Sequence, residues 1–138
     1  MKRNASLILI ELVIMLLVFA LAAALCVQAF AWADSRSRES KASDMALIQA
    51  QNAAEVLKHH RGDFSLAAKD LGGQWDGSRW VISYNGNWEL IGEDPAYFLQ
   101  AEQVLCETAY LGQAKLTVLD QEGTVLAELS VCWQEVAP

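Results

Sequence analysis

The chain has 138 residues, of which 54% are hydrophobic, and a formal net charge of −7 at pH 7. A chain this acidic lacks the basic surface with which proteins bind nucleic-acid phosphates. We therefore expect no direct nucleic-acid binding. The sequence contains no glycine-rich phosphate loop, no Cys/His metal spacing and no nucleophile–base signature, so we expect neither an enzyme nor a cofactor or metal site.

The first element is an apolar run at residues 7–32, in which only Glu11 and Gln28 are polar. About 20 apolar residues suffice for a helix to cross a bilayer. The run is longer than the core of a secretory signal and has no small-residue cleavage site followed by a polar start. We therefore expect a retained transmembrane helix over residues 7–33, with Trp32 as an interfacial aromatic anchor.

Glu11 is the unusual residue of this run. An acid at the centre of a membrane span costs about 2.5–3.5 kcal/mol on insertion scales, and such residues usually mark function. Because Glu11 lies near the end of the run, one interpretation is a carboxylate that reaches the lipid headgroups. The other interpretation is a role in assembly, which the residues before Glu11 favour.

A short basic leader, residues 1–6, precedes the apolar run and carries Lys2 and Arg3. A basic leader, four apolar residues and then Glu11 together resemble the class III signal of type IV prepilins and pseudopilins. The resemblance implies that a prepilin peptidase cleaves between Ser6, which stands where glycine is usual, and Leu7. It also implies N-methylation of Leu7, and pairing of Glu11, the fifth mature residue, with the N-terminal amine of a neighbouring subunit.

The resemblance further implies a minor pilin or pseudopilin, a structural subunit of a type II secretion, type IV pilus or competence filament. Such a subunit waits in the cytoplasmic membrane as a single-pass protein, with its C-terminal domain outside the cytoplasm, and can be extracted into a cell-surface filament. Its partners would be other pilin or pseudopilin subunits, the prepilin peptidase and membrane lipid.

The alternative is an uncleaved, single-pass anchored domain that binds or senses something. Basic residues flank the cytoplasmic side of membrane spans, and Arg36, Arg38 and Lys41 follow this span as Lys2 and Arg3 precede it. The positive-inside rule therefore does not by itself place the domain outside the cytoplasm.

Beyond the span, no glycine or proline occurs before Gly62. Residues 34–61 are therefore expected to continue the helix as a soluble half, which bends, loosens or restarts only where serines recur at residues 35–43. One helical face of this half is small and apolar, which suits packing on a sheet: Ala46, Ala50, Ala53, Ala54 and Leu57.

Residues 62–138 should form a short helix and an antiparallel sheet. Asp63 is the expected N-cap of the helix, and Gly72 follows its end. Strands are expected at residues 79–84 and 87–91, joined by a hairpin at Asn85-Gly86, and then at residues 97–108, 115–120 and 124–136. The predicted fold is α+β and pilin-like, a long N-terminal helix packed on an antiparallel sheet of about 4–5 strands.

The last predicted strand alternates between two faces. Its apolar set should face the helix, with Glu128 and Ser130 on the opposite face: Val125, Ala127, Leu129, Val131 and Trp133. Cys106 and Cys132 both fall in predicted strands. They could form a disulfide across neighbouring strands outside the cytoplasm, or remain two buried free thiols.

Two small groups of polar residues remain. Adjacent residues of a helix point about 100° apart, so His59 and His60 cannot readily chelate one metal, and we interpret them as cations at a solvated helix C-terminus. Glu93 and Asp94 share a loop, but two acids without further ligands are a weak signal for calcium.

Overall fold

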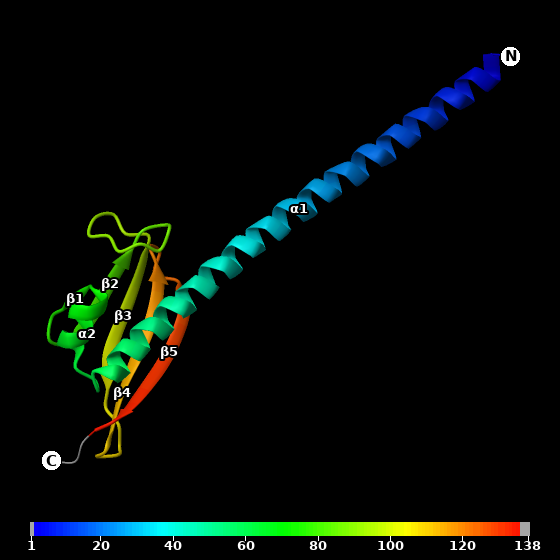
Figure 1. Ribbon diagram of the computed structural model, residues 1–138. Helices are drawn as coiled ribbons and strands as arrows, with labels where there is room; N and C mark the ends of the chain where they lie inside the picture. Colours follow the sequence, from blue (N-terminus) through cyan, green and yellow to red (C-terminus); the bar gives the residue numbers. More distant parts are fainter. Residues whose placement is uncertain (1, 136–138) are drawn as a thin grey trace. The chain divides into compact units, whose positions relative to one another are not determined.

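A computed structural model describes residues 2–135, and the side chains from residue 4 onward (Figure 1). The chain comprises two compact units, Met1–Ser40 and Lys41–Pro138. The fold is α+β as predicted, with these elements in chain order: α1 (Lys2–His59), α2 (Phe64–Leu71), β1 (Gln74–Trp75), β2 (Arg79–Tyr84), β3 (Tyr97–Val104), β4 (Leu111–Asp120) and β5 (Val125–Gln134).

Helix α1 is continuous and belongs to both units. It passes through the serines of residues 35–43 without a break, so the predicted restart there does not occur. In the first unit every described side chain is exposed. In the second unit, residues 41–59 lie along one face of the sheet (Figure 1), and all five members of the predicted apolar face are buried there.

The end of α1 is a Schellman motif. The N–H of Gly62 donates to the carbonyl of Leu57 (2.9 Å), and the N–H of Arg61 donates to the carbonyl of Lys58 (3.1 Å). Both Arg61 and Gly62 have positive φ, 50° and 83°. Glycine adopts this conformation without steric cost, and the chain can therefore reverse at once into α2.

Helix α2 starts at its predicted N-cap. The Asp63 carboxylate accepts a hydrogen bond from the N–H of Leu66 at 3.1 Å. Phe64 is buried and stacks on Trp75 of β1, with ring centroids 4.6 Å apart. At the other end of α2, Asp70 contacts Nε2 of His60 at 2.5 Å. The sequence suggested a solvated cation at the end of α1, but His60 contacts a carboxylate of α2.

The sheet has five antiparallel strands in the order β1-β2-β3-β4-β5. The predicted strand at residues 87–91 is wrong: on the edge of β2 away from β3, one isolated bridge joins Tyr84 to Leu90, and the N–H of Ile91 donates to the carbonyl of Ser83 (3.1 Å). The cause is Asn85, whose Oδ1 accepts the N–H groups of Asn87 (2.9 Å) and Glu89 (3.0 Å) and folds the segment into a compact turn.

The other predicted strands exist with shifted ends. Strand β3 stops at Val104 rather than residue 108, and β4 starts at Leu111 rather than residue 115. The alternation of β5 is confirmed at residues 130–133, since Val131 and Trp133 are buried while Ser130 and Cys132 are exposed. Val125, predicted to face the helix, is instead 52% exposed, because a register shift interrupts the alternation at the start of the strand. Between the alanine face of α1 and the sheet lies the core, with these large, fully buried side chains: Leu57, Trp80, Ile82, Leu99, Leu116 and Val118.

Trp133 closes one end of the core against two glycines. Gly112 lies directly opposite it on β4, and Gly62 follows the end of α1. A Cβ atom at either glycine would overlap the Trp133 indole. The absence of side chains at both positions is therefore what makes room for the largest residue of β5.

Candidate functional site

Glu11 is the only charged residue in residues 4–33 of α1. Its helical neighbours are apolar and exposed, with Leu7 65% and Met15 65% accessible. Among the described residues, none forms an ion pair with Glu11. The carboxylate therefore lies among exposed apolar side chains on a helix that supplies no counter-charge among its described residues.

The structure places the two residues of the predicted cleavage site within the same helix. Ser6 and Leu7 lie in α1, and both are exposed. Leu7 and Glu11 are four residues apart, so they lie on one face of the helix. An amine created at Leu7 and the Glu11 carboxylate would thus be presented on the same side, available to each other or to neighbouring helices.

Trp32 is the last residue of the apolar run, and the side chains that follow it in α1 form pairs within the helix. The Arg36 guanidinium lies 5.3 Å from the centroid of the Trp32 ring, a cation–π geometry. Nε of Arg38 lies 3.2 Å from the Asp34 carboxylate, one helical turn away. One helix in the described chain is thus long and apolar enough to cross a membrane, with an aromatic residue and charges at its end.

The cysteines do not form the predicted pair. Cys106 and Cys132 are free in the structure, and Cys106 lies in the loop after β3 rather than in a strand. Strands β3 and β5 are not neighbours, because β4 lies between them. The alternative of two buried thiols is also wrong, since Cys132 is exposed and Cys106 is half-buried. Alternation correctly put Cys132 on the outer face of β5, but strand order could not be read from the sequence.

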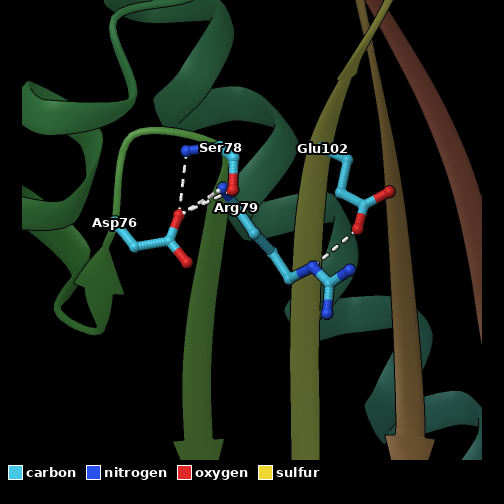
Figure 2. Close-up of polar contacts among 4 residues, drawn as sticks. All are labelled: Asp76, Ser78, Arg79 and Glu102. Atoms are coloured by element: carbon cyan, nitrogen blue, oxygen red, sulfur yellow. Dashed lines mark hydrogen bonds and ion pairs between the residues drawn. The ribbon is translucent and has the colours of Figure 1, made fainter.

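Opposite charges alternate across the outer face of the sheet. Nε of Arg79 on β2 lies 2.6 Å from Glu102 on β3, and Nζ of Lys115 on β4 lies 3.1 Å from Glu128 on β5 (Figure 2 shows the first pair). All four side chains are about half exposed, so each pair contributes at most about 1 kcal/mol. Because these charges neutralise one another, they do not form a binding site of one sign.

Asp76 organises the turn that leads into β2 (Figure 2). Its Oδ1 accepts three hydrogen bonds, from the N–H (2.8 Å) and hydroxyl (2.9 Å) of Ser78 and from the N–H of Arg79 (2.8 Å). The hydrogen bond from the Ser78 N–H, followed by that from Arg79, lowers the pKa of the Asp76 carboxyl. Asp76 therefore fixes the start of β2 through its Oδ1 atom.

The described residues contain no group of three or more His, Cys, Asp or Glu side chains that could hold a metal ion. A pocket of about 440 Å³ lies between the outer face of β2 and the segment after the Asn85 turn. Its lining has no ionisable side chain: Gly73, Gln74, Val81, Ser83, Leu90, Ile91 and Gly92. Such a pocket supplies neither a general acid nor a general base.

Comparison of the chain with protein-family models, with curated proteins and with solved structures gave no match. The chain itself therefore supplies the evidence for its function. It has a helix able to span a membrane, one carboxylate near the start of that helix, and an α+β domain that begins at Lys41.

Proposed function

We propose that the protein is a membrane-anchored structural subunit of a type IV filament, a minor pilin or pseudopilin of a type II secretion, pilus or competence system. In this role the apolar helix holds the subunit in the cytoplasmic membrane, with the domain outside the cytoplasm. A prepilin peptidase removes residues 1–6, and other subunits then surround the helix in the filament. The fold supports the proposal, since a long N-terminal helix packed on a small antiparallel sheet is consistent with a pilin-like domain.

Glu11 is the observation that carries the proposal. A carboxylate surrounded by exposed apolar side chains is costly in lipid or in a helix bundle. Cleavage before Leu7 would create an ammonium group four residues away, about one helical turn along the axis from Glu11. Pairing Glu11 with the amine of a neighbouring subunit offsets the cost of burying each charge, so the pair favours association of correctly aligned helices.

The first test is the mass of the mature protein. We expect that protein extracted from the membranes of a host with its own prepilin peptidase lacks residues 1–6 and carries one methyl group on Leu7. A protein that retains the leader would instead support the alternative function, an uncleaved anchored domain that binds or senses something. The basic residues Arg36, Arg38 and Lys41 behind the span are the observation that favours this alternative.

The second test is Glu11→Gln, with Gln28→Ala as the matched control at the other polar position of the run. Removing one member of a buried ion pair costs about 3–5 kcal/mol, enough to lower subunit docking by two orders of magnitude or more. We expect Glu11→Gln to insert normally in membrane fractions but to be lost from purified filaments, whereas Gln28→Ala enters both. Normal incorporation of Glu11→Gln would refute the pairing role.

A further inference from the structure

The pocket of about 440 Å³ lies at the edge of β2 that faces away from β3, and we call it the β2-edge pocket. Strand β1 covers the first part of this edge. The segment after the Asn85 turn covers the last part, where the N–H of Ile91 donates to the carbonyl of Ser83 at 3.1 Å. The pocket lies where these two segments approach each other, since residues 73–74 line one side of it and residues 90–92 the other.

The β2-edge pocket is apolar and contains a free hydrogen-bond donor. Its apolar lining comes from Val81, Leu90 and Ile91, and Leu90 is 58% exposed. The carbonyl of Ser83 points to this edge of β2, so the N–H of the same residue points there as well. No described residue accepts a hydrogen bond from this N–H. The pocket therefore fits an uncharged, apolar group that carries a hydrogen-bond acceptor.

A strongly exposed apolar side chain lies on the loop between β3 and β4, residues 105–110, which we call the Leu105 loop. Leu105 is 98% exposed, so it makes almost no contact within its own domain. Val104, Tyr110 and Leu111 beside it are between 37% and 57% exposed. Single exposed apolar residues are common on protein surfaces, but a group of them indicates an interaction site. Within the described chain the carbonyl of Leu105 accepts no hydrogen bond, so this loop also offers a free acceptor.

The β2-edge pocket and the Leu105 loop lie at opposite ends of the sheet (Figure 1). Ser83 in the pocket is level with Phe98 near the start of β3, whereas Leu105 follows the last residue of β3. At about 3.3 Å per residue, the rise from residue 98 to residue 105 is about 23 Å. A chain therefore cannot fill its own pocket with Leu105, but a second copy can.

The two surfaces complement each other and belong to one chain, which makes a second copy the matching partner. The Leu105 side chain fits the apolar lining of the pocket, and the free carbonyl of Leu105 fits the free N–H of Ser83. Because the two surfaces differ, the contact is head to tail, and each copy uses its loop toward one neighbour and its pocket toward another. A head-to-tail contact repeats from copy to copy and generates a ring or an open filament.

We propose that copies of this protein associate head to tail through their domains, with the Leu105 loop of one copy inserted into the β2-edge pocket of the next. The inference rests on the proposed function and names a contact between domains in that filament. Exposed acids lie near both surfaces, Glu107 on the loop and Glu93 and Asp94 after the pocket residue Gly92. Their repulsion opposes the contact and is screened by salt, so salt should favour the association.

Photocrosslinking in purified filaments tests the contact. In the full chain, p-benzoylphenylalanine replaces Leu105, which keeps this position apolar, and the filaments are irradiated. We expect an adduct of two copies in which the crosslinked peptide of the second copy contains residues 73–74, 81–83 or 90–92, with a yield that rises with salt concentration. An adduct at other residues, an adduct to a different polypeptide, no adduct, or a yield that falls with salt would overturn the proposal.

Leu90→Asp and Val125→Asp form a matched pair for this experiment. Each adds one negative charge at an exposed apolar position, 58% and 52% exposed, but only Leu90 lines the pocket. We expect Leu90→Asp to lower the adduct yield per incorporated subunit at least ten-fold, and Val125→Asp to leave it unchanged. Equal yields in the two variants would overturn the proposal. Ile91→Asp replaces Leu90→Asp if the melting temperature shows that the latter does not fold.

The amount of protein in the filaments keeps this proposal separate from the proposed function. If the wild-type chain were absent from purified filaments, the proposed function would be refuted, and the contact that rests on it would fall as well. If the chain were present in filaments but crosslinked outside the pocket, only the head-to-tail contact would be refuted.

Discussion

Gly112→Ala tests the packing of Trp133 against the start of β4. The added methyl group would overlap the Trp133 indole, which is a rigid ring and cannot yield as a flexible side chain would. The indole is also 4% exposed and is bounded by Gly62, so little free space lies around it. Forcing an extra methyl group into a well-packed core costs about 1–3 kcal/mol, and we expect destabilisation in this range.

The assay is a thermal melt of the full chain in detergent, followed by near-UV circular dichroism of the tryptophans. For a domain of this size, each kcal/mol lowers the melting temperature by about 4–8 °C. Gly86→Ala is the matched control, because no atom lies within 4 Å of its added Cβ and its φ is not positive. We expect no measurable shift for the control.

A double-mutant cycle identifies the cause of the destabilisation. Trp133→Leu alone should destabilise the domain by leaving a cavity, but Gly112→Ala added to it should then cost much less than in the wild type. The reasoning is refuted if Gly112→Ala melts with the Gly86→Ala control. Strict additivity of the two changes would refute it equally, because the cost would then not arise from the contact.

Three further predictions concern the sheet and its turns. Leu129→Asp should unfold the isolated Lys41–Pro138 unit, whereas Ser130→Asp on the outer face should be tolerated. If circular dichroism melts gave the reverse result, the register of β5 would be wrong by one residue. Burial raises the pKa of Tyr84 to about 12 from the ordinary 10.0. Because the unfolded chain then loses this proton at a lower pH than the folded chain, the free energy of unfolding should fall between about pH 10 and 12. Thermal melts of Tyr84→Phe should lack this fall. Because hydrogen bonds lower the pKa of Asp76, its contribution is present above the ordinary carboxyl pKa and is lost as the pH falls through the folded value. The melting temperatures of wild type and Asp76→Asn should therefore converge in acid, and a constant difference down to acid pH would contradict this role.

Local patterns predicted much of this fold because their physical causes are local. Helical spacing of small residues identified the buried face of α1 from Ala46 to Leu57, since a helix presents every third or fourth residue to the same side. The Asp63 cap was predictable because a carboxylate and the N–H three residues later are close in any helix start. The outward position of Cys132 followed from strand alternation in the same way.

The errors in the turns occurred where a side chain, and not the backbone alone, organises the chain. Asn85-Gly86 has the composition of a two-residue hairpin turn, yet the Asn85 side chain accepts the N–H groups of Asn87 and Glu89, and only the Tyr84–Leu90 bridge forms where a strand is predicted. The Asp76 turn was missed too, although Asp-Gly-Ser is a recognisable turn signal.

The sequence by itself determined the apolar helix, the isolated carboxylate at Glu11 and the alternation of β5, because composition and periodicity act over a few neighbouring residues. Only the tertiary structure decided which strands are neighbours, and hence that Cys106 and Cys132 are separated by β4 and that β5 ends the sheet with an open edge. Strand order depends on contacts between residues far apart in the chain, and these arise only when the core between α1 and the sheet has formed.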